Sequence, residues 1–180
     1  MKLLKLLIIL ILVFSFNSPV SASRSTDSYD GNIFPIYAGN GSIVPPQTSL
    51  RESLLNDRVS ILFFYLDDSA DSKALAPVIS GIDLIWRNNV DIIALTTDEL
   101  QGKIFNDPKD EGYYWNGLIP QTIILDGSGN IKFDKNGFID IDEVNNTISE
   151  IKGIDFKNKF SVESFNEYNS IISNRNNEKK

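Results

Sequence analysis

The run from Val59 to Leu66 constrains the fold more than any other feature of the chain. It is apolar or aromatic apart from Ser60, and charged pairs bound it, Asp57-Arg58 before and Asp67-Asp68 after. A run of this length without polar alternation is typical of a strand that is buried on both faces. We therefore predict a layered fold in which this strand lies in the middle of a sheet.

The residues that follow this run alternate between helix and strand patterns. From Ser69 onward, apolar side chains recur at spacings of three and four, which predicts a helix that Pro77 kinks. Residues 90–95 form the next predicted strand, and a strand–helix–strand unit implies a parallel pair. Residues 97–115 are less regular and predict one or two short helices interrupted at Pro108.

Turn and capping residues predict the remaining elements. Residues 121–125 and 130–133 flank a Gly-rich turn, which indicates a hairpin. Ser49 and Glu52 have the spacing of a capping box at the start of a helix over 49–57, and we expect Asp140 or Asp142 to cap a final helix. The order β-α-β-α-β-β-α predicts an α/β fold with a mostly parallel sheet that ends in an antiparallel hairpin, flanked by helices.

Residues 1–22 have the composition of an export signal. Lys2 and Lys5 provide a basic start, an apolar stretch runs from Leu3 to Phe16, and Val20-Ser21-Ala22 offers small residues for cleavage. The stretch is shorter than the ~20 residues that a membrane-spanning helix needs. We predict a cleaved signal peptide over 1–22, with an uncleaved membrane anchor as the alternative.

The composition excludes several kinds of chemistry. The chain has no cysteine and no histidine, so it cannot form disulfides, thiolate nucleophiles, Fe–S clusters or Ser-His-Asp triads. Its 17 basic and 24 acidic residues give a net charge of −7, which argues against a nucleic-acid partner. Residues 134–143 faintly resemble a calcium loop, but the glycine spacing is wrong. The sequence therefore predicts neither a metal nor a cofactor.

Two motifs resemble the thioredoxin-like superfamily, in particular its TlpA-like branch. Residues 63–77 (FFYLDDSADSKALAP) are similar to the strand, active-site turn and Pro-kinked first helix, with Ser69 and Ser72 where the family has its Cys-x-x-Cys cysteines. Residues 118–131 (LIPQTIILDGSGNI) are similar to the proline loop, strand and hairpin. The resemblance covers about residues 49–152. It implies a thioredoxin-like fold with a cis proline at Pro120 that faces the active-site turn.

The resemblance divides the chain into four parts. These are the signal peptide (1–22), a leader segment (23–48), the thioredoxin-like domain (49–152), and a C-terminal helical extension with a polar tail (153–180). The signal, leader and cysteine-less core together are similar to cyanobacterial and thylakoid photosystem I accumulation factors. This similarity implies an exported protein of the thylakoid lumen, thylakoid membrane or periplasm.

The predicted function is protein binding without redox chemistry. Thiol–disulfide exchange needs a thiolate, so Ser69 and Ser72 have no redox role, and we interpret Ser69 or Asp68 as the cap of the helix. The loop before the family's cis proline pairs with extended peptides, and a client is therefore expected there, photosystem I subunits or assembly intermediates included. The predicted partner-binding residues are those of the turn and the proline loop, with two aromatic anchors: Ser69, Ala70, Asp71, Ser72, Leu118, Ile119, Pro120, Tyr113 and Trp115.

Two other functions remain open from the sequence. The first is an enzyme that would use acids and a lysine at the start of the first helix, namely Asp67, Asp68, Asp71 and Lys73, for acid–base chemistry. Acidic residues are also expected there for electrostatic reasons, because they complement the helix dipole. The second is a structural subunit of a membrane-associated complex, for which residues 153–180 would offer an apolar face.

Overall fold

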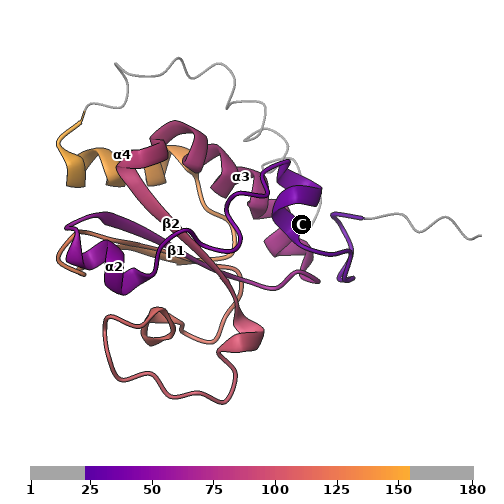
Figure 1. Cartoon of the computed structure of the whole chain (residues 1–180). Coiled ribbons are helices and arrows are strands. Elements are labelled where there is room, and N and C mark those ends of the chain that lie inside the picture. The colour runs from indigo at the N-terminus through magenta and orange to yellow at the C-terminus, as the bar shows by residue number, and fades with distance from the viewer. Residues whose placement is uncertain (1–22, 155–180) are drawn as a thin grey trace, which may run out of the picture.

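The computed structural model of the protein describes residues 23–154. The predicted signal peptide and most of the predicted C-terminal extension lie outside these residues. The described chain contains four strands in one sheet, three α-helices and four short helical turns (Figure 1). In chain order the elements are η1 (Phe34–Ala38), α2 (Leu50–Leu55), β1 (Val59–Tyr65), α3 (Ala70–Trp86), η2 (Arg87–Asn89), β2 (Val90–Thr96), η3 (Thr97–Glu99), η4 (Glu111–Tyr114), β3 (Gln121–Leu125), β4 (Ile131–Asn136) and α4 (Ile141–Lys152).

Strand β1 is the buried strand that the sequence predicts. All seven of its residues are buried, and it lies between β2 and β3 in the sheet order β2-β1-β3-β4. Successive side chains of a strand point to opposite faces. Phe63 and Tyr65 accordingly belong to one core cluster, whereas Leu62 and Phe64 belong to the other. The absence of polar alternation in this run thus reflects burial on both faces.

The sheet is mixed, so the prediction of a mostly parallel sheet is wrong. Only β1 and β2 are parallel, whereas β1 pairs antiparallel with β3 and β3 pairs antiparallel with β4. Where the sequence predicted one or two short helices interrupted at Pro108, residues 97–120 contain two short 3-10 turns, η3 and η4, and no α-helix. Without a crossover helix the chain does not return to the start of the sheet. Strand β3 therefore begins at the edge where β2 ends and runs in the opposite direction.

Two cores cover the two faces of the sheet. Helices α3 and α4 and the turn η1 pack on one face, where Phe34 makes edge-to-face contacts with Phe63 and Tyr65. Residues 97–120 cover the opposite face, to which Leu100 and Tyr114 contribute. Figure 1 shows the two helices above the sheet and the long loop below it.

The predicted helix caps are confirmed. The Ser49 hydroxyl accepts a hydrogen bond from the Glu52 N–H at 3.3 Å, at the start of α2. The Asp140 carboxylate accepts from the Asp142 N–H at 2.9 Å, at the start of α4. These side chains satisfy first-turn N–H groups that have no partner within the helix.

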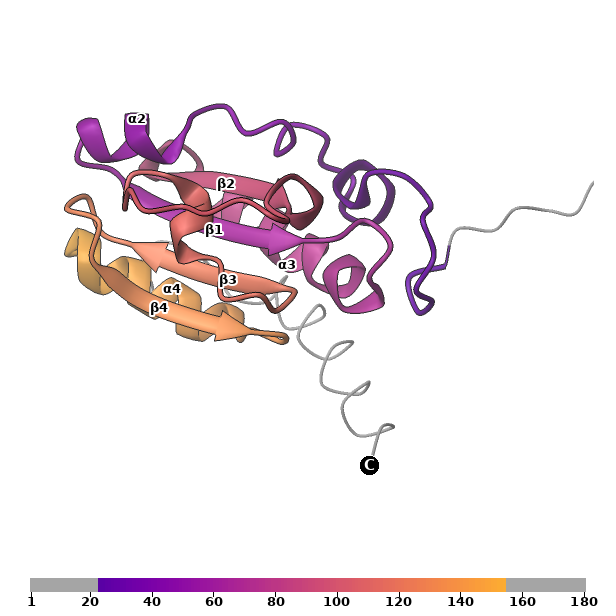
Figure 2. The same cartoon turned by 90° about the horizontal axis from the view of Figure 1, so that it is seen from below.

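One edge of the sheet collects the segments of functional interest, and we call it the carboxyl edge. In the register Tyr65 pairs with Thr96, and Phe64 pairs with Gln121, so β1 and β2 end where β3 begins. The turn before α3, the residues after β2 and the proline loop therefore lie at this edge (Figure 2). Among residues 23–154, no helix has both the length and the apolar character needed to cross a bilayer.

Candidate functional site

The turn between β1 and α3 uses its two serines for structural hydrogen bonds. The Ser69 hydroxyl accepts from the Ser72 N–H at 3.2 Å and caps α3. The Ser72 hydroxyl is fully buried and accepts from the Leu66 N–H at 3.3 Å. The sequence-based interpretation of Ser69 as a helix cap is thus confirmed. The Ser69 hydrogen bond lies within the turn, and the Ser72 hydrogen bond joins the turn to the end of β1.

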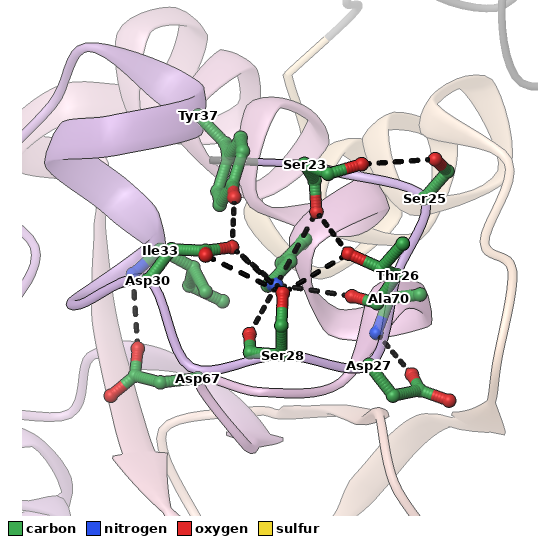
Figure 3. Close-up of polar contacts among 11 residues, drawn as sticks. Ser23, Ser25, Thr26, Asp27, Ser28, Asp30, Ile33, Tyr37, Asp67 and Ala70 are labelled. Carbon is green, nitrogen blue, oxygen red and sulfur yellow. Dashed lines mark hydrogen bonds and ion pairs between the residues drawn. The ribbon is translucent and has the colours of Figure 1, made fainter. Parts of the chain in front are cut away.

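The side chain of Lys73, one residue further along α3, is completely buried. Its ammonium group donates to the Ser23, Thr26 and Ser28 carbonyl oxygens and lies 2.7 Å from the Asp30 carboxylate. A buried ammonium is costly unless it is paired and hydrogen-bonded. Leader residues 23–30 supply these partners by wrapping around it (Figure 3).

The ion pair between Lys73 and Asp30 is extended by Tyr37. The Tyr37 hydroxyl donates to Asp30 at 2.6 Å, and the Lys73 ammonium lies 5.6 Å from the centre of the tyrosine ring. The hydrogen bonds from Lys73 and Tyr37 hold the pKa of Asp30 at about 2. Burial, reinforced by the hydrogen bond to Asp30, raises the pKa of Tyr37 to about 12. The lowered pKa keeps the Asp30 carboxylate ionised, and the raised pKa keeps the Tyr37 hydroxyl neutral, over a wide pH range.

Two further carboxylates fasten the leader to the turn. Asp27 accepts from the Ala70 N–H at 2.9 Å, so the leader contributes to the capping of α3. Asp67 accepts from the Ile33 N–H at 3.0 Å, which joins the end of β1 to the start of η1 (Figure 3). Burial raises the pKa of the Asp67 carboxyl, although the Ile33 hydrogen bond opposes the shift. The leader is thus part of the domain and covers much of the turn.

These contacts decide what the acids and the lysine of the turn can do chemically. Lys73 has no exposed surface, and its ammonium is surrounded by acceptors, so it is not accessible to a substrate as an acid or a base. Asp68 and Asp71 are exposed. No group of three or more acidic side chains within residues 23–154 is arranged to hold a metal ion. The arrangement favours a structural role for Lys73.

The proline loop is held by its own hydrogen bonds and exposes an apolar side chain. The Trp115 indole N–H donates to the Leu118 carbonyl at 3.3 Å, and the Gly137 N–H donates to the Pro120 carbonyl at 2.8 Å. The Ile119–Pro120 peptide bond is cis, as the resemblance implied. Pro120 is buried and Ile119 is half-buried. Leu118 is 60% exposed, which leaves a large apolar side chain at the carboxyl edge.

The aromatic residues before this loop divide between the core and the surface. Tyr114 is buried, and its hydroxyl donates to the Pro108 carbonyl at 2.9 Å. Trp115 is half-buried against the same core, whereas Tyr113 is 49% exposed. Of the two predicted anchors, Tyr113 is therefore the more exposed.

Asp27, Asp30 and Tyr37 belong to the site although no sequence pattern placed them there. Their contacts with α3 connect residues more than thirty positions apart, and a local sequence pattern cannot indicate such pairs. One feature of the sequence does point to these partners, namely the position of Lys73 in its helix. Lys73 precedes Ala76 by three positions and so lies on the buried stripe of the helix. A lysine in such a stripe requires a carboxylate from elsewhere in the chain.

A comparison with curated proteins identifies a relative of this chain. The thylakoid membrane protein slr1796 of Synechocystis sp. (strain ATCC 27184 / PCC 6803 / Kazusa) is 35% identical over 158 residues, which cover 84% of this chain and 77% of that protein. The chain belongs to the slr1796 family. The alignment covers more of the chain than the described residues alone, so the relationship is not confined to a short motif.

Other comparisons add little to this assignment. No family model matches the chain. Among solved structures, the crystal structure of a designed protein is similar with a TM-score of 0.42 and 24% identity, over 57% of this chain and 88% of that one.

Proposed function

We propose that this chain is a redox-inactive, thioredoxin-like protein of the thylakoid that binds other proteins during the assembly of membrane complexes. The observation that carries the proposal is the proline loop, which exposes Leu118 at the carboxyl edge while its backbone is held in place. An exposed apolar side chain on a fixed loop suits contact with an extended client segment. Tyr113 is the aromatic anchor nearest in sequence that is open to solvent.

The assignment to the thioredoxin-like superfamily is supported by two segments. A buried strand leads through a serine turn into α3, which continues through Pro77. The Pro120 loop lies at the same edge of the sheet, immediately before β3. The mixed four-stranded sheet, with α3 and α4 on one face, accommodates both segments. Because the chain lacks cysteine, the surface around the motif is what remains available for function.

The thylakoid location rests on the family. The Synechocystis relative is named a thylakoid membrane protein, and residues 1–22 of this chain have the composition of an export signal. We therefore assign the protein to the lumen or to the lumenal face of the thylakoid membrane. Photosystem I subunits or assembly intermediates are the proposed clients.

The test is capture of photosystem I subunits from solubilised thylakoid membranes. Ile119→Asp places a charge in the proline loop and should weaken capture by about 1–3 kcal/mol, which is about 5-fold to 150-fold, through an unpaired charge and lost apolar contact. Leu84→Asp is the matched control, because Leu84 is 57% exposed near the end of α3, at the opposite edge. Circular dichroism should show both variants folded.

A different pattern would contradict the proposal. Truncation after Ile154 removes the predicted C-terminal extension. If this truncation abolishes capture while Ile119→Asp leaves it unchanged, the client binds the extension and not the proline loop. Capture that is unaffected by either change would show that the client binds neither the proline loop nor the extension. Failure of the unmodified chain to capture photosystem I subunits would remove them from the list of clients.

A further inference from the structure

Acidic side chains lie beside the proline loop at the carboxyl edge. We call them the acidic group, which consists of Asp67, Asp68, Asp98 and Glu99. The first two follow β1 and the last two follow β2, and both strands end where β3 begins. The proline loop, residues 118–120, immediately precedes β3. The acidic group and the loop therefore share one edge of the sheet (Figure 2).

One core cluster connects the acids after β2 with the proline loop. Leu100 directly follows Glu99 and is buried in the cluster on the face that residues 97–120 cover. Trp115 packs against the same cluster, and its indole N–H donates to the Leu118 carbonyl. The exposed side chain of Leu118 is thus held in a fixed relation to these acids.

The charges of the acidic group have no ion-pair partner within residues 23–154. Asp68, Asp98 and Glu99 are exposed. Burial chiefly raises the pKa of Asp67, and the negative charges of Asp68 and Asp98 raise it further, in keeping with the closeness of the two strand ends. A partner that reaches the proline loop therefore meets several negative charges next to an exposed leucine.

We propose that the client segment is basic, an extended stretch with an apolar side chain for Leu118 and lysine or arginine side chains for the acidic group. This inference rests on the proposed function and adds the chemical class of the client. The aliphatic stems of lysine and arginine can lie along an apolar surface while their charged ends reach the acids. Complementary charge speeds association and selects the partner, whereas an acidic segment would meet like charges.

The test measures how the full chain binds three labelled peptides by fluorescence anisotropy. Each peptide has a central Val-Leu-Val, whose β-branched residues favour an extended chain, and the flanking residues are all Lys, all Gln or all Glu. A triple variant, Asp68→Asn with Asp98→Asn and Glu99→Gln, removes three exposed charges of the acidic group. Leu118→Ser removes the apolar contact and adds no charge.

The matched control removes three exposed acids from the other end of the sheet. It combines Glu52→Gln in α2, Asp57→Asn in the turn before β1 and Glu150→Gln near the end of α4. The control lowers the total negative charge of the chain by the same amount. It therefore separates a local effect of the acidic group from the overall charge of −7.

We expect the Lys peptide to bind roughly tenfold more tightly than the Gln peptide, because a few exposed ion pairs each contribute about twofold. The Glu peptide should bind most weakly. The triple variant should lose this order, as should the unmodified chain in about 1 M salt, where charges are screened within about 3 Å. The control should keep the order, and Leu118→Ser should weaken the binding of all three peptides.

Three outcomes would overturn the inference. Equal affinity for the three peptides, with Leu118→Ser still weakening each of them, would remove the charge preference and leave the proposed function standing. A preference for the Lys peptide that is unchanged in Leu118→Ser, or lost equally in the control, would place the basic segment away from the proline loop. The third is a chain that captures photosystem I subunits but does not bind the Lys peptide.

Discussion

The Lys73 ammonium lies 2.7 Å from the Asp30 carboxylate, across 43 positions of the chain. The lysine belongs to the first turn of α3, and the aspartate belongs to the leader. Because the lysine is fully buried, the helix cannot pack in this way without the leader. The leader (23–48) is thus required for the domain to pack, although it precedes the predicted thioredoxin-like domain.

Lys73→Met is expected to destabilise the protein. The methionine fills similar space but removes the donor that the Asp30 carboxylate and three leader carbonyl groups share, and it leaves Asp30 without its ion-pair partner. We expect Tm to fall by an amount on the order of 5 °C. Lys135→Met is the control, because its ion pair with Glu143 is exposed. Equal effects of the two changes in thermal unfolding would contradict a structural role for the buried pair.

The leader contact should also be sensitive to acid. The pKa of Asp30 is lowered to about 2, so the stability it provides is present above the unfolded value near 4 and is lost as the pH falls toward 2. Asp30→Asn should remove this part of the pH dependence in urea unfolding. It should also speed hydrogen exchange of the leader at neutral pH.

The control for this prediction is Asp126→Asn. Hydrogen bonds and Lys132 in the β3–β4 turn outweigh burial and lower the pKa of Asp126 to about 2 as well. This variant should therefore lose a similar part of the acid dependence but leave exchange of the leader unchanged. Accelerated leader exchange in Asp126→Asn would mean that general destabilisation, not the local contact, releases the leader.

Asp67→Asn should stabilise the protein near neutral pH. Burial raises the pKa of Asp67, so its stabilising contribution is present at low pH and is lost as the pH rises through the folded pKa. Asparagine stays neutral, and its amide oxygen can still accept the Ile33 N–H. Urea unfolding should show the gain at neutral pH and none in acid. Asp142→Asn, which removes an exposed acid from the first turn of α4, should give no gain.

The turn between β1 and α3 carries serines and no cysteine, so we predict that the protein has no thiol–disulfide activity. With no thiol in the chain, insulin reduction should equal the buffer blank. Ser69→Cys with Ser72→Cys should form a disulfide under mild oxidation, because Ser69 caps α3 and its side chain already contacts the backbone N–H of Ser72 in the first turn. Thiol titration measures the outcome. A pair that stays reduced would show that these positions do not match the family's cysteines.

The local elements could be derived from the sequence because their causes are local. The Val59–Leu66 run indicated a strand buried on both faces, and β1 is buried throughout. Ser49, Ser69 and Asp140 cap the helices that follow them. The turn at Asp126 joins β3 to β4 as predicted, with its carboxylate accepting from the Ser128 and Asn130 N–H groups. Each of these signals depends on residues within a few positions of one another.

The sequence by itself therefore determined the elements, the caps, the hairpin and the exclusion of thiol chemistry. The tertiary structure decided the direction of β3, because a connection of 3-10 turns returns the strand antiparallel where a helix would have crossed over. It also decided the role of Lys73, which beside the exposed Asp71 had suggested acid–base chemistry. Its partners in the leader are brought to it only by folding, since pairing across 43 positions depends on burial and not on local pattern.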